Sequence, residues 1–491
     1  MLNSQLFKIL RTFSKEEMKE FEKLVASPFF STGRNLLPFF KSLKKFYPDF
    51  NDERLTEQSL FKSLYPGKSF SKDTINKLLT DLLKLSFEYI KQLAVRKNPI
   101  VINSIVSKEA LIKNLNSIAL KIINKEVHNL ESKKLDVNYF FDMENIEMAK
   151  AHYYYYNQEP LLQFKHDMEF SEFIINKFIV QASIQLENLT FWKNYGWKEI
   201  EKNGLMILFD SIDIEKIIGI MKDLNMKSRE TILSLISLYS IYAYKNISDH
   251  KYYNEYRNII FNNLKLFSDE LKYDIINSLR ILTLLKSNIS QSDEFERAAF
   301  EINDLLVKEK IYINPNLNYL SKNEFQNYFR TAFDLEEFDW AEKFVKNYSK
   351  EIKEEERAET VNYCKASLSF AKKDFDNCFK YLNLLGASST DKSLNYYLKA
   401  AIYYDQEHFD EAESVLNSYF KFVRRGDNIR KDRKEFHYNY IKCLRNLINF
   451  EFHKDEKYII NLEIEIGKAC NKVLLKYWLK EKLLLSKKRC A

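Results

Sequence analysis

Apolar residues recur along most of the chain at the three- and four-residue spacing of helices that bury one face. The clearest stripe follows Ser71, which is the N-cap predicted for its helix. Tyr65-Pro66-Gly67 precedes it as a turn signal, and another helix is expected between Thr56 and that turn. The positions of the stripe are Ile75, Leu78, Leu79, Leu82, Leu83 and Ile90.

A capping box opens an earlier helix. The Ser14 hydroxyl and the Glu17 carboxylate have the spacing at which each accepts a hydrogen bond from the other's backbone N–H. Phe13 and Met18 stand where a hydrophobic staple would pack. Beyond residue 101, long amphipathic stretches with short polar breaks predict antiparallel helix pairs. The clearest stretches are 137–157, 166–192, 228–245, 268–286 and 292–308.

A sequence period appears after residue 320. The segments 336–345, 373–382 and 407–416 superimpose, each with Phe-Asp followed two positions later by a small residue. The first two phenylalanines are 37 residues apart and the next two are 34 apart. A period of about 34 residues is typical of a repeated helix pair, in which the small residue allows the two helices to approach closely. The small residues are Ala341, Cys378 and Ala412.

In these segments the chain resembles the tetratricopeptide-repeat family. The best copy is LKAAIYYDQEHFDEAESVLNSY, although Ala400 stands where the family often has glycine and the closing proline is missing. The first hundred residues, with KEEMKEFEKLVASPFF and LFKSLYPGKSF, also resemble the start of an uncharacterised bacterial protein family, which implies no function.

We therefore predict an all-α protein, an α-solenoid of antiparallel, tetratricopeptide-like helix pairs with an N-terminal helical subdomain. The expected parts are a basic subdomain (1–97), a helical-hairpin region (101–320), tetratricopeptide-like repeats (321–470), and a basic C-terminal helix and tail (471–491).

The resemblance implies a concave surface built from the first helix of each pair. Its lining is polar and aromatic, as surfaces that bind peptides tend to be. The alternative is that the protein's own neighbouring helices fill it. The positions that the resemblance assigns to this groove are Asn323, Gln326, Arg330, Thr360, Tyr363, Ser367, Tyr397, Tyr404 and Asp405.

The amino-acid composition favours an α-helical fold and argues against a membrane protein. Eight glycines and seven prolines in 491 residues are too few for a hairpin-rich sheet protein. The longest uncharged apolar run, 231–244, is too short to span a bilayer, and it predicts a buried helix rather than a membrane segment. Five widely spaced cysteines favour a reducing compartment, so we expect a cytoplasmic protein.

Charge is uneven, because residues 1–100 carry +7, equal to the net charge of the whole chain. The helices around the Tyr65 turn could form a helix-turn-helix that reads DNA, although their connection is longer than usual. The alternative is that these are ordinary solvated lysines. The candidate nucleic-acid contacts are Lys62, Lys68, Lys72, Asn76, Lys77 and Thr80.

Motifs for catalysis are missing from the sequence. It contains no glycine-rich phosphate loop, no serine-hydrolase elbow, no paired-cysteine metal motif and no histidine with glutamate three residues before it. Asp405 and His408 share one helix end, which we interpret as a solvated turn. We therefore expect no cofactor and no enzyme activity, and a protein-binding scaffold with a protein or peptide partner. The alternatives are a DNA-associated regulator and an enzyme with an unrecognised helical site.

Overall fold

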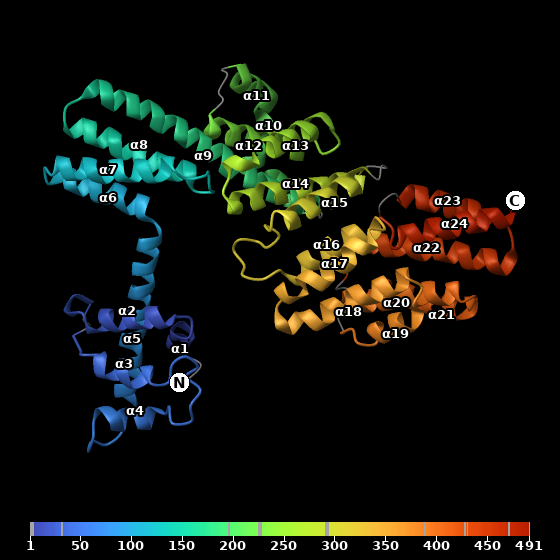
Figure 1. The fold of residues 1–491 in the computed structure, drawn as a ribbon, viewed down its shortest axis with the longest axis horizontal. Coiled ribbons are helices and arrows are strands. Elements are labelled where there is room, and N and C mark those ends of the chain that lie inside the picture. Colours follow the sequence, from blue (N-terminus) through green and yellow to red (C-terminus); the bar gives the residue numbers. More distant parts are fainter. Residues whose placement is uncertain are drawn as a thin grey trace. The chain divides into compact units, whose positions relative to one another are not determined.

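The chain folds almost entirely into α-helices, as predicted. A computed structural model describes residues 4–30, 33–194, 197–223, 228–289, 294–386, 389–426, 429, 431–469 and 472–490. Within these ranges it forms 24 α-helices and four short 3-10 helices and no β-strand (Figure 1). Contacts divide the chain into two compact units, Met1–Glu131 with Asp142–Phe170 and Ser132–Phe141 with Ser171–Ala491.

The first unit begins with a helical cluster that has its own hydrophobic core. Phe7, Phe21, Phe40 and Phe50 are fully buried in it together with Ile75. The helices of the cluster are α1 (Gln5–Leu10), α2 (Lys15–Ala26), α3 (Leu37–Lys44), α4 (Glu57–Leu64) and α5 (Lys72–Lys97).

Local sequence signals set where these helices begin. Ser14 and Glu17 form the predicted capping box, with hydrogen bonds of 3.1 and 2.7 Å. Ser71 caps α5 as expected, and Leu78 lies in the core. The expectation for Ile90 is wrong. That side chain is exposed, because Tyr89 turns into the core against Phe13 and Phe21 instead.

Two helical hairpins follow, formed by α6 (Pro99–Ile112) with α7 (Asn116–Glu131) and by α8 (Tyr139–Tyr156) with α9 (Pro160–Asn194). In the second unit, α12 (Arg229–Lys245) contains the apolar run 231–244, nearly all of which is buried as predicted. None of the described helices is long and apolar enough to cross a membrane. The other helices before residue 320 are α10 (Gly204–Ser211), α11 (Ile214–Asp223), α13 (Lys251–Asn263), α14 (Asp269–Ile289) and α15 (Glu294–Lys308).

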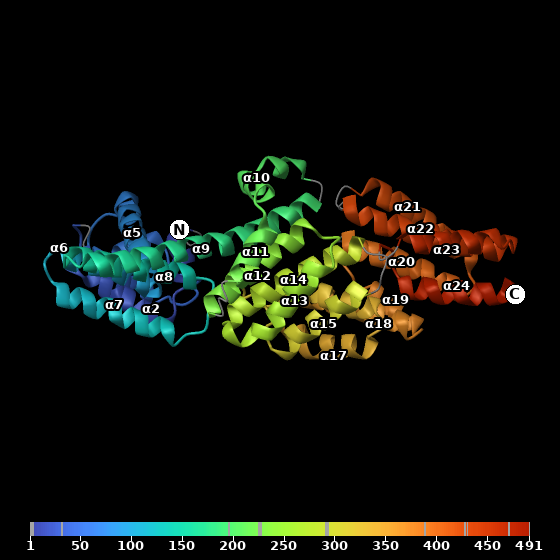
Figure 2. The same cartoon turned by 90° about the horizontal axis from the view of Figure 1, so that it is seen from above.

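The C-terminal part consists of four successive helix pairs and a final helix. Within a pair the helices pack against each other, and α18 packs against both α16 and α20 (Figures 1 and 2). The small residues Ala341, Cys378 and Ala412 are completely buried, which agrees with close approach of the paired helices. The helices are α16 (Lys322–Asp334), α17 (Phe338–Tyr348), α18 (Glu354–Ala371), α19 (Phe375–Leu382), α20 (Ser389–Asp405), α21 (Phe409–Arg425), α22 (Lys431–His453), α23 (Lys457–Ala469) and α24 (Lys476–Cys490).

Among the helices that the structure describes, six end with the same left-handed turn. In the turn after α16, Glu336 has φ 63° and the N–H of Glu337 donates to the carbonyl of Ala332, at 3.0 Å. This six-to-one hydrogen bond is the Schellman arrangement, which usually places glycine at the left-handed position. None of these six left-handed positions is a glycine. The chain can therefore form many such turns with only eight glycines in its sequence. The six left-handed residues are Asn114, Gln158, Lys310, Glu336, Lys373 and Glu407.

Candidate functional site

The nine predicted groove positions lie on α16, α18 and α20, and we call them the inner surface. Asn323 is exposed, Arg330, Tyr397 and Asp405 are half-buried, and the other five are buried. Six of the nine line one of two cavities, whereas Asn323, Gln326 and Thr360 line neither.

The first cavity, of about 40 Å³, has room for a few water molecules. Arg330, Tyr363, Ser367 and Tyr397 line it, so the structure brings together predicted residues from three helices. Aromatic rings of Phe329, Phe333 and Phe436 complete much of the wall, together with Asp334 and residues 473–475.

The Arg330 guanidinium is the main charge of this cavity. Within the described chain it donates no hydrogen bond. Burial disfavours its charged form, but the neighbouring Tyr363, Asp334 and Tyr397 outweigh this and raise the pKa of Arg330. Desolvation by the surrounding protein raises the pKa of the Asp334 carboxyl, although the cations of Arg330, Arg433 and Lys476 oppose this shift. The cavity therefore presents a permanent cation with free hydrogen-bonding capacity.

The second cavity, of about 70 Å³, lies between α20, α22 and α24. Tyr404 and Asp405 of the inner surface line it with Glu451 of α22. Asp405 is not the solvated turn residue that we expected. It accepts a hydrogen bond from the Trp478 indole at 3.1 Å, and the Lys482 ammonium lies 2.6 Å from it. His408, its neighbour in the sequence, is exposed.

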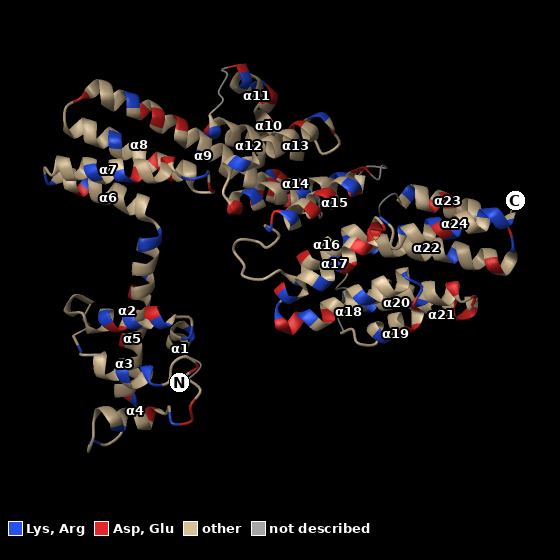
Figure 3. Cartoon of the chain, in the orientation of Figure 1, with Lys and Arg blue, Asp and Glu red and all other residues tan. Residues whose placement is uncertain are grey.

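The six candidate nucleic-acid residues all lie on or between α4 and α5, and all are exposed. No ion pair involves Lys62, Lys68, Lys72 or Lys77 in the described chain. Other basic residues of the same helical cluster are paired, such as Arg96 with Glu20 at 2.6 Å. Figure 3 shows basic and acidic positions interleaved along the helices. The α4–α5 turn therefore carries four accessible lysines that make no ion pair in the described chain, although unpaired lysines such as Lys15 and Lys45 also occur elsewhere in the cluster.

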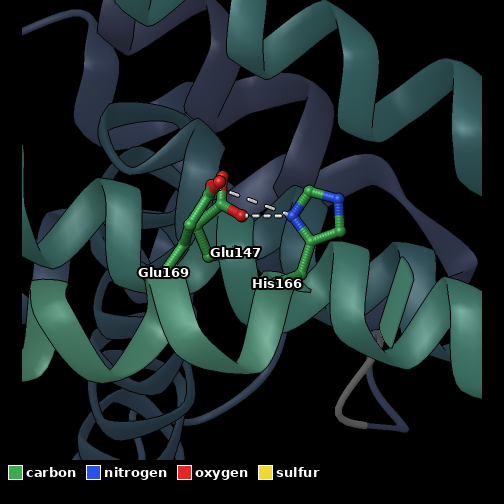
Figure 4. Close-up of side chains that lie close together, drawn as sticks. All are labelled: Glu147, His166 and Glu169. Carbon is green, nitrogen blue, oxygen red and sulfur yellow. Dashed lines mark hydrogen bonds and ion pairs between the residues drawn. The ribbon is translucent and has the colours of Figure 1, made fainter. Parts of the chain in front are cut away.

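A histidine and two glutamates converge on the α8–α9 hairpin (Figure 4), and no motif in the sequence indicates them. The metal-binding motif considered in the sequence has glutamate three residues before histidine, whereas Glu169 follows His166 by three residues. The Nδ1 atom of His166 lies 2.6 Å from Glu147 and 3.9 Å from Glu169, and the three ligand atoms are all within 4.8 Å of one another.

The protein's own side chains account for the burial of Glu147. One of its carboxylate oxygens faces His166, and the other accepts a hydrogen bond from Lys150 at 2.6 Å. The ring of Tyr154 stacks on His166 at 5.2 Å. The arrangement is a closed ion-pair cluster, and it requires no metal to satisfy the buried carboxylate.

A second carboxyl network, around Glu187 of α9, was also invisible in the sequence. Its carboxylate accepts a hydrogen bond from Ser240, and Tyr256 shares a hydrogen bond of 3.0 Å with Ser278. Burial, opposed by the bonds from Ser240 and Ser278, raises the pKa of Glu187 to about 7. These partners come from α9, α12, α13 and α14, so only the folded chain assembles the network.

Comparisons of the chain with protein families, with curated proteins and with solved structures find no match. Neither of the two resemblances noted in the sequence is therefore supported by a family match.

Proposed function

We propose that the chain is a non-enzymatic scaffold whose tetratricopeptide-like solenoid binds a protein partner on its inner surface. One observation carries the proposal: residues predicted for a groove from the repeat alone converge on a cavity that contains Arg330, whose donors are unused within the described chain. A guanidinium of this kind recognises a carboxylate, because its planar fork of donors matches two oxygens. The partner is therefore expected to present an acidic side chain or a chain terminus to this cavity.

The repeat geometry supports the solenoid on which this function depends. The turns after α16, α18 and α20 have the same hydrogen bond and the same backbone conformation. The first helices of these three pairs pack against one another in order. Stacked helix pairs produce an extended surface of the kind that repeat proteins use for binding.

Replacing Arg330 by glutamine tests the scaffold. The tagged full chain, purified from its native host with nuclease present, should recover partners that the variant recovers about tenfold less well, because a charge-assisted hydrogen bond is lost. Quantitative mass spectrometry measures the ratio. Lys343→Gln, an exposed change on α17, is the matched control and should leave recovery unchanged. If every partner is recovered equally with Arg330→Gln, the inner surface is not the binding site.

A second candidate function, nucleic-acid binding by the N-terminal helices, rests on the unpaired lysines of α4 and α5. The full chain should bind a DNA duplex at about 50 mM salt, and the variant Lys62→Gln/Lys72→Gln/Lys77→Gln should bind more weakly with a smaller dependence on salt. Fluorescence anisotropy over a salt series measures both. Lys41→Gln/Lys84→Gln/Lys91→Gln removes the same charge from paired lysines and is the control. Failure of the unaltered chain to bind duplex at this salt concentration would eliminate the second candidate.

A further inference from the structure

Residues 472–490, which we call the C-terminal segment, lie along the inner surface. The ring of Tyr477 contacts Phe333, and the ring of Trp478 contacts Phe370 and Tyr404, at centroid distances of 5.6 to 6.2 Å. These contacts reach the first helix of three successive pairs. The segment thus crosses the surface that the repeat pattern assigned to a partner.

Charge complementarity fixes the segment there. Lys482 pairs with Asp405 at 2.6 Å and Arg489 pairs with Glu451 at 2.8 Å. Both acids are nearly inaccessible, at 7% and 3% exposure of the side chain. Trp478, Lys482 and Arg489 are spaced by four and seven residues, so they share one face of α24.

Packing along the rest of the contact is incomplete. Both cavities described above are walled in part by the C-terminal segment, the first by residues 473–475 and the second by Lys482, Leu485, Ser486 and Arg489. In α24 itself only Trp478, Leu479 and Ser486 are buried, and Leu484 is 62% exposed. Elements with few buried apolar contacts open at low free energy. The segment also packs against α22 and α23, and it buries Val473, Leu475 and Leu479 beside the Trp478 indole. Several ion pairs hold it, and those to Asp405 and Glu451 involve the most buried acids. Within α24, polar and charge contacts therefore outnumber buried apolar side chains.

We propose that the C-terminal segment is an intramolecular ligand, and that the partner of the inner surface is a basic amphipathic helix of the same pattern that exchanges with it. This rests on the proposed scaffold function and names the partner class. The required pattern is an aromatic residue followed by basic residues four and eleven positions later, which would meet Asp405 and Glu451. When the segment leaves, these two acids and the aromatic rings of α18 and α20 become accessible to such a helix. An acidic group elsewhere on the same partner can still reach Arg330.

A competing helix can bind only after the segment has left. Its apparent affinity is therefore the intrinsic affinity multiplied by the fraction of molecules in which the segment is displaced. A fluorescent synthetic peptide of residues 472–490 is therefore expected to bind the unaltered full chain weakly. The full-chain variant Trp478→Ala/Lys482→Ala, in which the segment is loosened and the inner surface is intact, should bind the peptide at least about tenfold more tightly. Adding Asp405→Asn to that variant should remove most of the gain.

Two controls match this variant. Leu484→Ala/Lys488→Ala changes a leucine and a lysine four residues apart on the exposed side of α24, and it should bind the peptide as weakly as the unaltered chain. A peptide that itself carries Trp478→Ala/Lys482→Ala should bind none of the chains. Equal binding of the unaltered peptide to the unaltered chain and to the loosened variant would overturn the proposal.

Amide hydrogen exchange on the unaltered chain provides a second, independent measurement. If the loosened variant loses its helical circular dichroism and is therefore unfolded, hydrogen exchange alone tests the proposal. Amides of α24 should exchange faster than central amides of α22. Equal protection of the two helices would identify α24 as a fixed cap and overturn the proposal. The scaffold itself would still stand if partner recovery depended on Arg330, so the two failures are distinguishable.

Discussion

Replacing Lys482 by methionine is expected to lower the free energy of opening of α24 by about 3 kcal/mol at neutral pH. Asp405 is nearly inaccessible, and Lys482 is its only cation within ion-pair distance in the described chain. Without that ammonium, only the Trp478 indole would remain as a donor to the buried carboxylate. Removing one partner of a buried pair is costly because the other charge is left uncompensated. Hydrogen exchange of the α24 amides measures the loss.

An exposed ion pair between α24 and α23 is the natural comparison. Lys487 lies 2.7 Å from Glu463, but both side chains are about half exposed, so Lys487→Met should change the opening free energy by less than about 1 kcal/mol. Adding Asp405→Asn to Lys482→Met should restore part of the loss, since a neutral amide is less costly to bury than a carboxylate. Similar effects of Lys482→Met and Lys487→Met would contradict the assignment of Asp405 as a buried charge.

The second large effect concerns pH. Glu187→Gln is expected to stabilise the protein by about 2–3 kcal/mol at pH 8 and to have little effect near pH 4.5. The pKa of Glu187 is raised to about 7 in the folded chain by burial, whereas an unfolded glutamate titrates near its ordinary value of 4.5. Below that value the carboxyl is protonated in both states and the protein keeps its full stability. As pH rises through 7, the folded state resists ionisation that the unfolded state has already completed, so stability is lost.

Urea denaturation of both chains between pH 4.5 and 8 measures this difference. Glutamine is uncharged throughout, so the gap between the two free energies should widen with pH and level off above 7. Glu463→Gln, at an exposed carboxylate, should show no such widening and serves as the control. A gap for Glu187→Gln that stays constant with pH would show that the substitution acts through packing instead of ionisation.

Local signals in the sequence predicted much of the helical structure, because they act over a few residues. The capping box at Ser14, the N-cap at Ser71 and the small residue at Ala412 all have the predicted role. Each depends on a spacing of four residues or fewer, or on a repeated pattern. Such signals could not predict which of Tyr89 and Ile90 is buried. The two residues are adjacent on one helix, so only one of them can face the core.

Longer-range features of the candidate site could not be predicted. The repeat pattern selected Arg330, Tyr363 and Tyr397, and they do line one cavity. Nothing in the sequence indicates that Trp478 bonds to Asp405, which is 73 residues earlier. Glu147 and His166 meet across a hairpin whose register is fixed by packing rather than by a motif. Such pairings follow from tertiary structure, and a single sequence does not encode them as a local pattern.

The left-handed turns are positions at which substitution by glycine should stabilise the protein. All six left-handed positions are exposed, and none belongs to the inner surface. A non-glycine side chain in this conformation costs roughly 1 kcal/mol that glycine would avoid, partly offset by the greater freedom of glycine in the unfolded chain. Four of the positions, Lys310, Glu336, Lys373 and Glu407, lie in the second unit with α24. Glycine at these four would therefore add roughly 2 kcal/mol to that unit if the gains are independent. This gain offsets much of the loss expected from Lys482→Met, so variants of α24 could be studied in a background that stays folded more readily.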